Sequence, residues 1–242
     1  MSRHIPRIFT SQTLVTQGSI TLSGKTAHHM MQVLRLLPGD GVRLFNGDDG
    51  EWHAHIWKTH KREVILKVGL RLRPPETPPV LALFFPLIKP ARLEWMIEKG
   101  TELGVTDFLP FRADYASQKP PGFERLEAIA QSATEQSGRL TLPHFGALHT
   151  LEDQLALWQN KTQTSLLFWG HPASEISLLE AARSLPPSAA RGFFVGPEGG
   201  WSPGEHDWFQ THAPEIQPVS LGRTILRAET AAVLGLGVLS VA

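Results

Sequence analysis

The C-terminal part of the chain contains two glycine-punctuated transitions from a predicted strand to a predicted helix, and these constrain the fold most. In the first, an apolar run over 191–195 leads directly into GPEGG at 196–200. Ser202 and Glu205 then have the spacing of a helix capping box, with Pro203 at the first helical position. The order is therefore a buried strand, a glycine-rich turn and a capped helix.

The second transition repeats this order. A short apolar run over 218–221 is broken by Gly222, and an apolar helix is predicted over 228–241. Glycine lets the backbone approach a ligand closely, and two such turns at strand ends of an open α/β sheet would face the crevice where ligands bind. Either turn alone is also typical of an ordinary strand-to-helix connection.

The common phosphate-binding and cysteine-based sites are excluded by the sequence. Neither G-x-x-x-x-G-K-[ST] nor G-x-G-x-x-G occurs, so the chain lacks the motifs of NTPases and of dinucleotide-binding proteins. There are no cysteines, which excludes disulfides, thiolate zinc sites and a cysteine nucleophile. His53 and His55 share one face of a predicted strand but lack a third ligand at metal-site spacing, so no metal is expected.

The chain divides at a proline-rich segment into two predicted domains, 1–73 and 80–242, joined by a linker at 74–79. The first shows short strands with hairpin chemistry at 46–50 and one helix near 26–36, which predicts a small β-barrel. The second alternates apolar strands with helices, which predicts a parallel sheet covered by helices on both faces. Its predicted strands cover 80–85, 105–109, 165–169, 191–195 and 218–221, and its predicted helices cover 91–103, 123–136, 151–159 and 228–241.

The net charge of zero hides an asymmetry between the N-terminal and C-terminal parts of the chain. Residues 1–75 hold 11 Lys and Arg against 5 Asp and Glu, a balance of +6, and residues 76–242 hold 12 against 18, a balance of −6. A basic module of this kind favours a phosphate-rich partner, although small β domains are often mildly basic. No apolar stretch reaches the roughly 18–20 residues of a membrane span, and no secretory signal is visible, so we expect a cytoplasmic protein.

Four segments together resemble one known family. These are GPEGGWSPGE at 196–205, LGRTILRAETAA at 221–232, EKGTELGV at 98–105 and EQSGR at 135–139. They are similar to the RsmE family of SPOUT-class RNA methyltransferases, which methylate N3 of a uridine in 16S ribosomal RNA. The resemblance implies a trefoil-knotted α/β domain, a PUA-like RNA-binding barrel, a homodimer and the assembled 30S subunit as substrate.

The resemblance also implies S-adenosylmethionine as the methyl donor, bound by the two glycine-rich segments. Members of that family often have Pro-Arg where this chain has Arg223-Thr224, and Thr where it has Ala228. The residues expected to bind the donor are Gly196, Glu198, Gly199, Gly200, Leu221, Gly222, Ile225, Leu226, Arg227 and Thr230.

The predicted chemistry requires removal of the uracil N3 proton and stabilisation of the resulting anion. Arg139 and Arg227 are candidates for binding phosphate or the charge on O2 or O4, and Glu229 is the candidate proton acceptor. A glutamate in the first turn of a helix also interacts favourably with the helix dipole, so a structural role for Glu229 stays open. The residues expected to contact RNA are Arg3, Arg7, Arg35, Lys58, Lys61 and Arg62.

Two alternatives stay open at this point. The enzyme could act on transfer RNA or on another ribosomal RNA nucleotide, or the chain could be a catalytically silent knotted protein that assists ribosome assembly. The N-terminal domain and the matching segments within 93–139 favour the RsmE family over the first alternative, and the intact glycines with Arg227 argue against the second.

Overall fold

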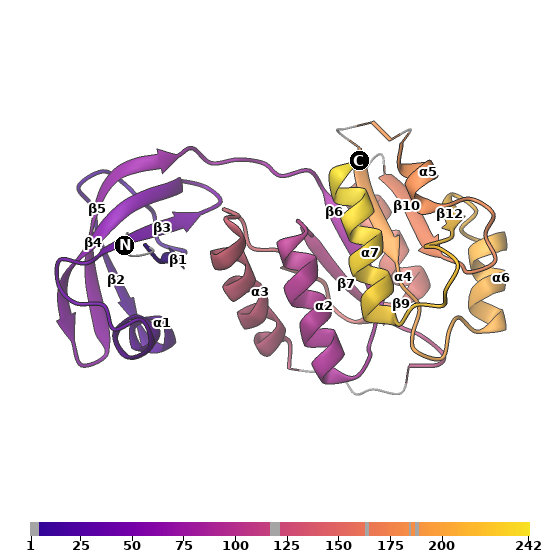
Figure 1. Cartoon of the computed structure of the whole chain (residues 1–242), viewed down its shortest axis with the longest axis horizontal. Coiled ribbons are helices and arrows are strands. Elements are labelled where there is room, and N and C mark those ends of the chain that lie inside the picture. The colour runs from indigo at the N-terminus through magenta and orange to yellow at the C-terminus, as the bar shows by residue number, and fades with distance from the viewer. Residues whose placement is uncertain (1–4, 117–121, 163–164, 184, 187–188) are drawn as a thin grey trace. The chain divides into compact units, whose positions relative to one another are not determined.

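The computed structural model describes residues 5–116, 122–162, 165–183, 185–186 and 189–242. The chain forms two compact units, whose helices and strands are labelled in Figure 1. The first unit contains residues up to 77 together with 134–142, and the second contains 78–133 together with 143–242. The assignment of 134–142 to the first unit is not evident in the sequence.

A five-stranded sheet with the order β1-β3-β4-β5-β2 forms the first unit. The predicted hairpin joins β3 to β4, and the Asn46 side-chain oxygen accepts hydrogen bonds from the backbone N–H groups of Asp48 and Asp49. Inward-facing side chains such as Ala54 and Ile56 are fully buried, which confirms the small β domain. The strands are β1 (Arg7–Phe9), β2 (Ser19–Ser23), β3 (Gly41–Asn46), β4 (Gly50–His60) and β5 (Glu63–Arg73).

The helix predicted near 26–36 is present over residues 24–33, but its geometry is not that of an α-helix throughout. The structure has α1 (Gly24–His28) followed by a π-helical turn, η1 (His29–Val33), which Arg35 follows in the left-handed region at φ 52°. A π-helix closes its hydrogen bonds one residue later than an α-helix, and the N–H of Leu34 accordingly donates to the carbonyl of His29 at 3.0 Å. Apolar spacing in the sequence does not reveal this extra residue per turn.

The buried carboxylate of Glu51 organises one end of the first unit. Its side chain is 1% exposed and forms an ion pair with Arg7 at 2.9 Å, while Arg73 lies 3.5 Å away. The Arg7 guanidinium also donates to the carbonyl oxygens of Thr134, Glu135 and Arg139 at 2.7–3.0 Å. These bonds tie 134–142 to the sheet of the first unit.

The second unit is built on a sheet whose described strands all pair in parallel. Their order is β12-β10-β11-β6-β7-β8, and β9 also pairs with β7. This confirms the predicted parallel sheet. The strands are β6 (Leu81–Pro86), β7 (Asp107–Arg112), β8 (His144–Phe145), β9 (His149–Thr150), β10 (Ser165–Gly170), β11 (Ala190–Phe194) and β12 (Ile216–Val219).

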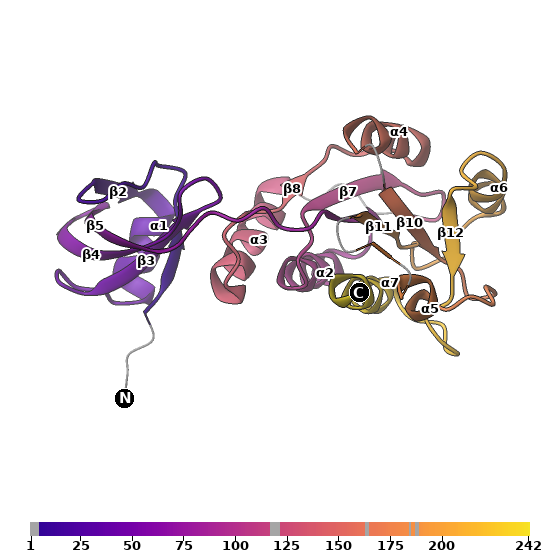
Figure 2. The ribbon, with the colours of Figure 1, turned by 90° about the horizontal axis from the view of Figure 1, so that it is seen from above.

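Helices cover both faces of this sheet (Figure 2). Along β6, Leu83 and Phe85 enter a core with α2, α3, α5 and α7, whereas Phe84 enters a second core with α4 and α6. This alternation explains why the sequence of β6 is continuously apolar. The helices are α2 (Pro90–Glu102), α3 (Phe123–Ser137), α4 (Leu151–Lys161), α5 (Leu178–Ala182), α6 (Pro203–Thr211) and α7 (Ala228–Val241).

The C-terminal helix α7 has both a buried and an exposed apolar side. Ala232, Leu236 and Leu239 are fully buried, whereas Leu234 is 41% exposed and Val241 is 86% exposed. The helix is therefore not wholly interior. Within the described part of the chain, no helix has both the length and the apolar character needed to cross a bilayer.

Candidate functional site

A cavity of about 680 Å³ lies in the second unit at the carboxyl ends of β10, β11 and β12. Segments that follow these three neighbouring strands provide most of its walls, as expected for a ligand crevice in an open parallel sheet. Its volume is within the roughly 300–1,000 Å³ of small-molecule sites.

The cavity brings together the two glycine-rich segments, 196–200 and 221–227. Thr230 is exposed on α7 and does not line the cavity, so its contact with a ligand stays a prediction. The predicted donor-binding residues that line it are Gly196, Glu198, Gly199, Gly200, Leu221, Gly222, Ile225, Leu226 and Arg227.

The predicted capping box fixes the end of the first glycine-rich segment. Ser202 Oγ accepts from the N–H of Glu205 at 3.1 Å, and a Glu205 carboxylate oxygen accepts from the N–H of Ser202 at 2.7 Å. The same two side chains bond to Asp114, which follows β7. The start of α6 is thereby attached to the segment that follows β7.

Glycine is required at several points of the cavity wall. Gly200 and Gly222 have φ values of 76° and 123°, which side chains of L-residues rarely adopt. Gly196 has no such torsion, but a Cβ there would lie 3.0 Å from the indole of Trp201. Bare backbone therefore makes room for the indole at Gly196, and open space remains at Gly200 and Gly222.

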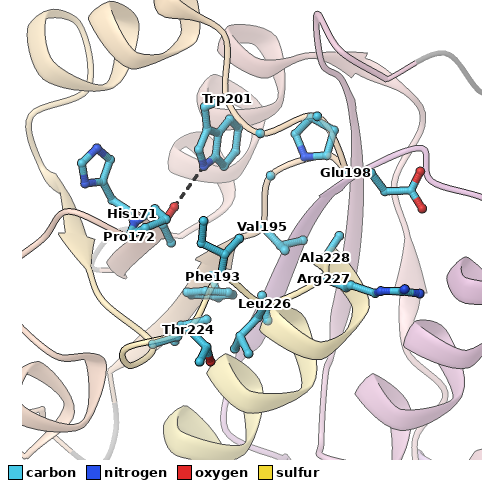
Figure 3. A pocket seen from close by; sticks show the side chains of 18 of the residues that line it. His171, Pro172, Phe193, Val195, Glu198, Trp201, Thr224, Leu226, Arg227 and Ala228 are labelled. Atoms are coloured by element: carbon cyan, nitrogen blue, oxygen red, sulfur yellow. Dashed lines mark hydrogen bonds between the residues drawn. The ribbon is translucent and has the colours of Figure 1, made fainter.

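A third segment, Gly170-His171-Pro172 after β10, completes the cavity. The indole Nε1 of Trp201 donates to the carbonyl of Gly170 at 3.0 Å (Figure 3). The sequence shows this segment as a turn after a buried strand, which is the same signal as the glycine-rich turns, but its part in the site was not predicted.

His171 and His206 line the cavity with their rings 5.0 Å apart, edge to face. Burial lowers the pKa of His171, and the neighbouring His206 lowers it further. His171 is therefore held toward its neutral form, in which one ring nitrogen is a hydrogen-bond acceptor.

The opposite side of the cavity is charged: Glu198 and Arg227 lie across from His171 (Figure 3). Arg92, from the first turn of α2, also lines it and forms an ion pair with Glu198 at 2.5 Å. Arg92 Nε lies 3.5 Å from Glu229, which is itself not a lining residue. Sequence reasoning missed Arg92, because nothing local distinguishes an arginine at the start of a helix.

The predicted RNA-contacting residues lie in the first unit, except that Arg3 is outside the described residues. The guanidinium of Arg7 is occupied by Glu51 and three carbonyl oxygens, which favours a structural role over the predicted RNA contact. Arg35, Lys58, Lys61 and Arg62 are exposed.

Arg139 belongs to 134–142 in the first unit and does not line the cavity. Its carbonyl accepts the hydrogen bond from Arg7, and burial lowers the pKa of its guanidinium to about 10. Its role in catalysis stays a prediction.

The exposed indole of Trp57 adds an aromatic surface beside two lysines of the first unit. The Nζ atoms of Lys58 and Lys67 lie 4.3 and 5.0 Å from its ring centre, as cation–π contacts. Trp57 is 48% exposed on β4 and shares its outward face with His53 and His55.

In the described part of the chain, no group of three or more His, Asp or Glu side chains could hold a metal ion.

Comparison with known families gives two matches. Residues 75–240 match the RNA methyltransferase domain, and residues 22–69 match the RNA methyltransferase PUA domain. The chain is 35% identical to the ribosomal RNA small subunit methyltransferase E of Rickettsia conorii, over 94% of this chain and 91% of that protein. It is 30% identical to the protein of the same name from Synechocystis, over 95% and 75%.

Solved structures agree with these matches over nearly the whole chain. A putative methyltransferase from Legionella pneumophila with bound SAM has a TM-score of 0.83 at 27% identity, covering 99% of this chain and 98% of that one. A ribosomal RNA small subunit methyltransferase E from Neisseria gonorrhoeae, bound to S-adenosyl methionine, has a TM-score of 0.82 at 26% identity, covering 98% of each chain. The chain therefore belongs to the ribosomal RNA small subunit methyltransferase E family of RNA methyltransferases.

Proposed function

We propose that this chain transfers a methyl group from S-adenosylmethionine to N3 of a uridine in 16S ribosomal RNA, with the assembled 30S subunit as substrate. The observation that carries the proposal is the cavity formed by the two glycine-rich segments at the strand ends. The names of the relatives support ribosomal RNA of the small subunit as the target. The uridine and its N3 follow from the resemblance of the sequence to the RsmE family.

The residues present fit this methyl donor. The backbone at Gly200 and Gly222 leaves open space for an adenine, since a Cβ at either position would meet nothing within 4 Å. Glu198 and Arg227 place opposite charges on one side of the cavity, which suits an amino-acid moiety bearing an ammonium and a carboxylate. When bound, the donor supplies an electrophilic methyl group on a sulfonium.

The protein's own contribution would be alignment, charge stabilisation and proton removal. Arg227 is exposed beside the cavity, where it can bind a phosphate or the negative charge on O2 or O4. Glu229 is proposed as the proton acceptor: it follows Arg227 and Ala228, which line the cavity, and its Oε2 has no hydrogen-bond partner among the described residues. For Arg139 we propose a contact with RNA phosphate or with the developing charge.

We assign RNA binding to 1–73, methyl transfer to 80–242, and the role of a linker to 74–79. The positive charge balance of residues 1–75 and the cations around Trp57 support the first assignment. Cations neutralise phosphates, and an exposed indole offers a base a surface for stacking. The proposed contacts are Arg35, Trp57, Lys58, Lys61, Arg62 and Lys67.

The active protein is proposed to be a cytoplasmic homodimer with a trefoil knot in its second domain. The exposed apolar side of α7, with Leu234 and Val241, supports a subunit contact because a lone surface helix would be polar there. Light scattering at micromolar concentration tests this, and a monomer would contradict it.

Mass spectrometry of ribosomal RNA from a strain lacking the gene tests the function. The proposal predicts the loss of one 3-methyluridine from small-subunit RNA and its return when the gene is restored. Loss of a different modified nucleotide would place the target elsewhere. An unchanged set of modifications would contradict the enzymatic proposal.

A further inference from the structure

One guanidinium contacts acidic side chains from two of the segments around the cavity. Arg92 Nη1 lies 2.5 Å from an oxygen of Glu198, which belongs to the glycine-rich segment after β11. Its Nε lies 3.5 Å from an oxygen of Glu229, in the first turn of α7. The first turn of α2, the 196–200 segment and the start of α7 therefore meet at Arg92.

The burial of these groups favours an interaction that holds the segments in place. The side chain of Glu229 is 13% exposed, and those of Arg92 and Glu198 are 28% and 31% exposed. Partly buried pairs are screened less than pairs in open solvent. Arginine suits this position because its planar fork can contact two acceptors at once, which a single ammonium does less well.

Removal of this arginine would leave two acidic groups close to the donor cavity without their shared counter-charge. Glu229 is the more sensitive of the two, because its Oε2 is already buried without a hydrogen-bond partner among the described residues. Glu198 would be free to turn, and its neighbours Gly199 and Gly200 offer little resistance to backbone movement.

We propose that Arg92 is a positioning residue: through Glu198 and Glu229 it fixes the 196–200 segment against the start of α7, and it thereby shapes the donor cavity. The proposal rests on the proposed function in taking S-adenosylmethionine as the ligand. It assigns Arg92 an effect on donor binding that acts through Glu198 and Glu229.

Calorimetric titration of the full chain with S-adenosylmethionine, without RNA, tests the proposal. Arg92→Ala should weaken binding by at least about tenfold, because small displacements of positioning groups have large effects. Arg92→Lys should fall between Arg92→Ala and the unchanged protein. The matched control is Arg125→Ala, which removes an exposed ion pair between Arg125 and Glu94 away from the cavity and should change the affinity by less than about twofold.

A double-mutant cycle separates positioning from independent contact with the ligand. If Arg92 acts through Glu198, then Arg92→Ala should weaken binding much less in a Glu198→Gln background than in the unchanged protein. Strictly additive effects, or an Arg92→Ala variant that binds as well as the unchanged protein, would overturn the proposal. If Arg92→Ala does not fold, Arg92→Lys takes its place in the same cycle.

The same titration keeps this inference separate from the proposed function. An unchanged protein that fails to bind S-adenosylmethionine would contradict the proposed function itself. If the unchanged protein binds S-adenosylmethionine, and Arg92→Ala and Arg92→Lys bind it equally well, only the positioning role is contradicted.

Discussion

The indole Nε1 of Trp201 donates a hydrogen bond of 3.0 Å to the carbonyl oxygen of Gly170. The bond joins the segments that follow the neighbouring strands β10 and β11. Gly170 and Trp201 are 31 residues apart in the sequence. It therefore closes one wall of the cavity.

We expect Trp201→Phe to weaken donor binding several-fold while the protein stays folded. The variant keeps an aromatic ring but loses the N–H donor, and a hydrogen bond of this kind contributes about 0.5–1.5 kcal/mol. Calorimetric titration with S-adenosylmethionine measures the effect. Trp208→Phe on α6 is the matched control, since Trp208 does not line the cavity. Equal affinities for both variants would argue against the role of this bond.

Gly222→Ala should reduce donor affinity because alanine cannot adopt φ 123° without strain. Residues in such torsions cost about 1–3 kcal/mol, so the segment would relax into another conformation. Gly204→Ala provides the control: its added Cβ would lie 3.8 Å from Ser202 Oγ, an ordinary contact. If both alanine variants bind the donor alike, the conformation of the 221–227 segment does not matter for binding.

Arg7→Met should destabilise the protein by about 3 kcal/mol, because it removes one partner of a buried ion pair with Glu51. The exposed Arg62→Met should change the free energy of unfolding by less than about 0.5 kcal/mol. Urea unfolding measures both. For RNA affinity we expect the reverse order: Arg62→Met should weaken RNA binding directly and by more than Arg7→Met does. An Arg7→Met variant of normal stability would restore Arg7 as a candidate RNA contact.

His171 should make the stability of the protein depend on pH. Its pKa in the folded protein is below the usual value near 6.5, because the ring is partly buried beside His206. The unfolded chain therefore binds more protons in the window between the two pKa values, and stability falls as the pH drops from 6.5 toward the lower value. This loss should be smaller in His171→Gln than in the unchanged protein, as measured by unfolding at several pH values. The control variant His60→Gln, at an exposed position, should show the same pH dependence of stability as the unchanged protein.

The features that could be predicted from the sequence depend on local chemistry. The predicted helix at 228–241 coincides with α7 (Ala228–Val241). Both hydrogen bonds of the predicted capping box between Ser202 and Glu205 are present. Caps and apolar runs carry their own signal, because the interacting groups are only a few residues apart.

The features that were missed depend on distant partners or on unusual helical geometry. Arg92 meets Glu198 across 106 residues, and Arg7 reaches Arg139 across 132. Neither arginine differs from a surface arginine in its local sequence. The π-helical turn η1 was missed because its apolar pattern also fits an ordinary helix.

The proposed activity can be measured as methyl transfer in a purified system. The chain is incubated with S-adenosylmethionine carrying a labelled methyl group and with 30S subunits from a strain that lacks the enzyme. We expect the label to enter 16S ribosomal RNA as 3-methyluridine, at one uridine, and large subunits to stay unlabelled. Unlabelled 30S subunits, with a chain that is folded and binds the donor, would contradict the proposed activity.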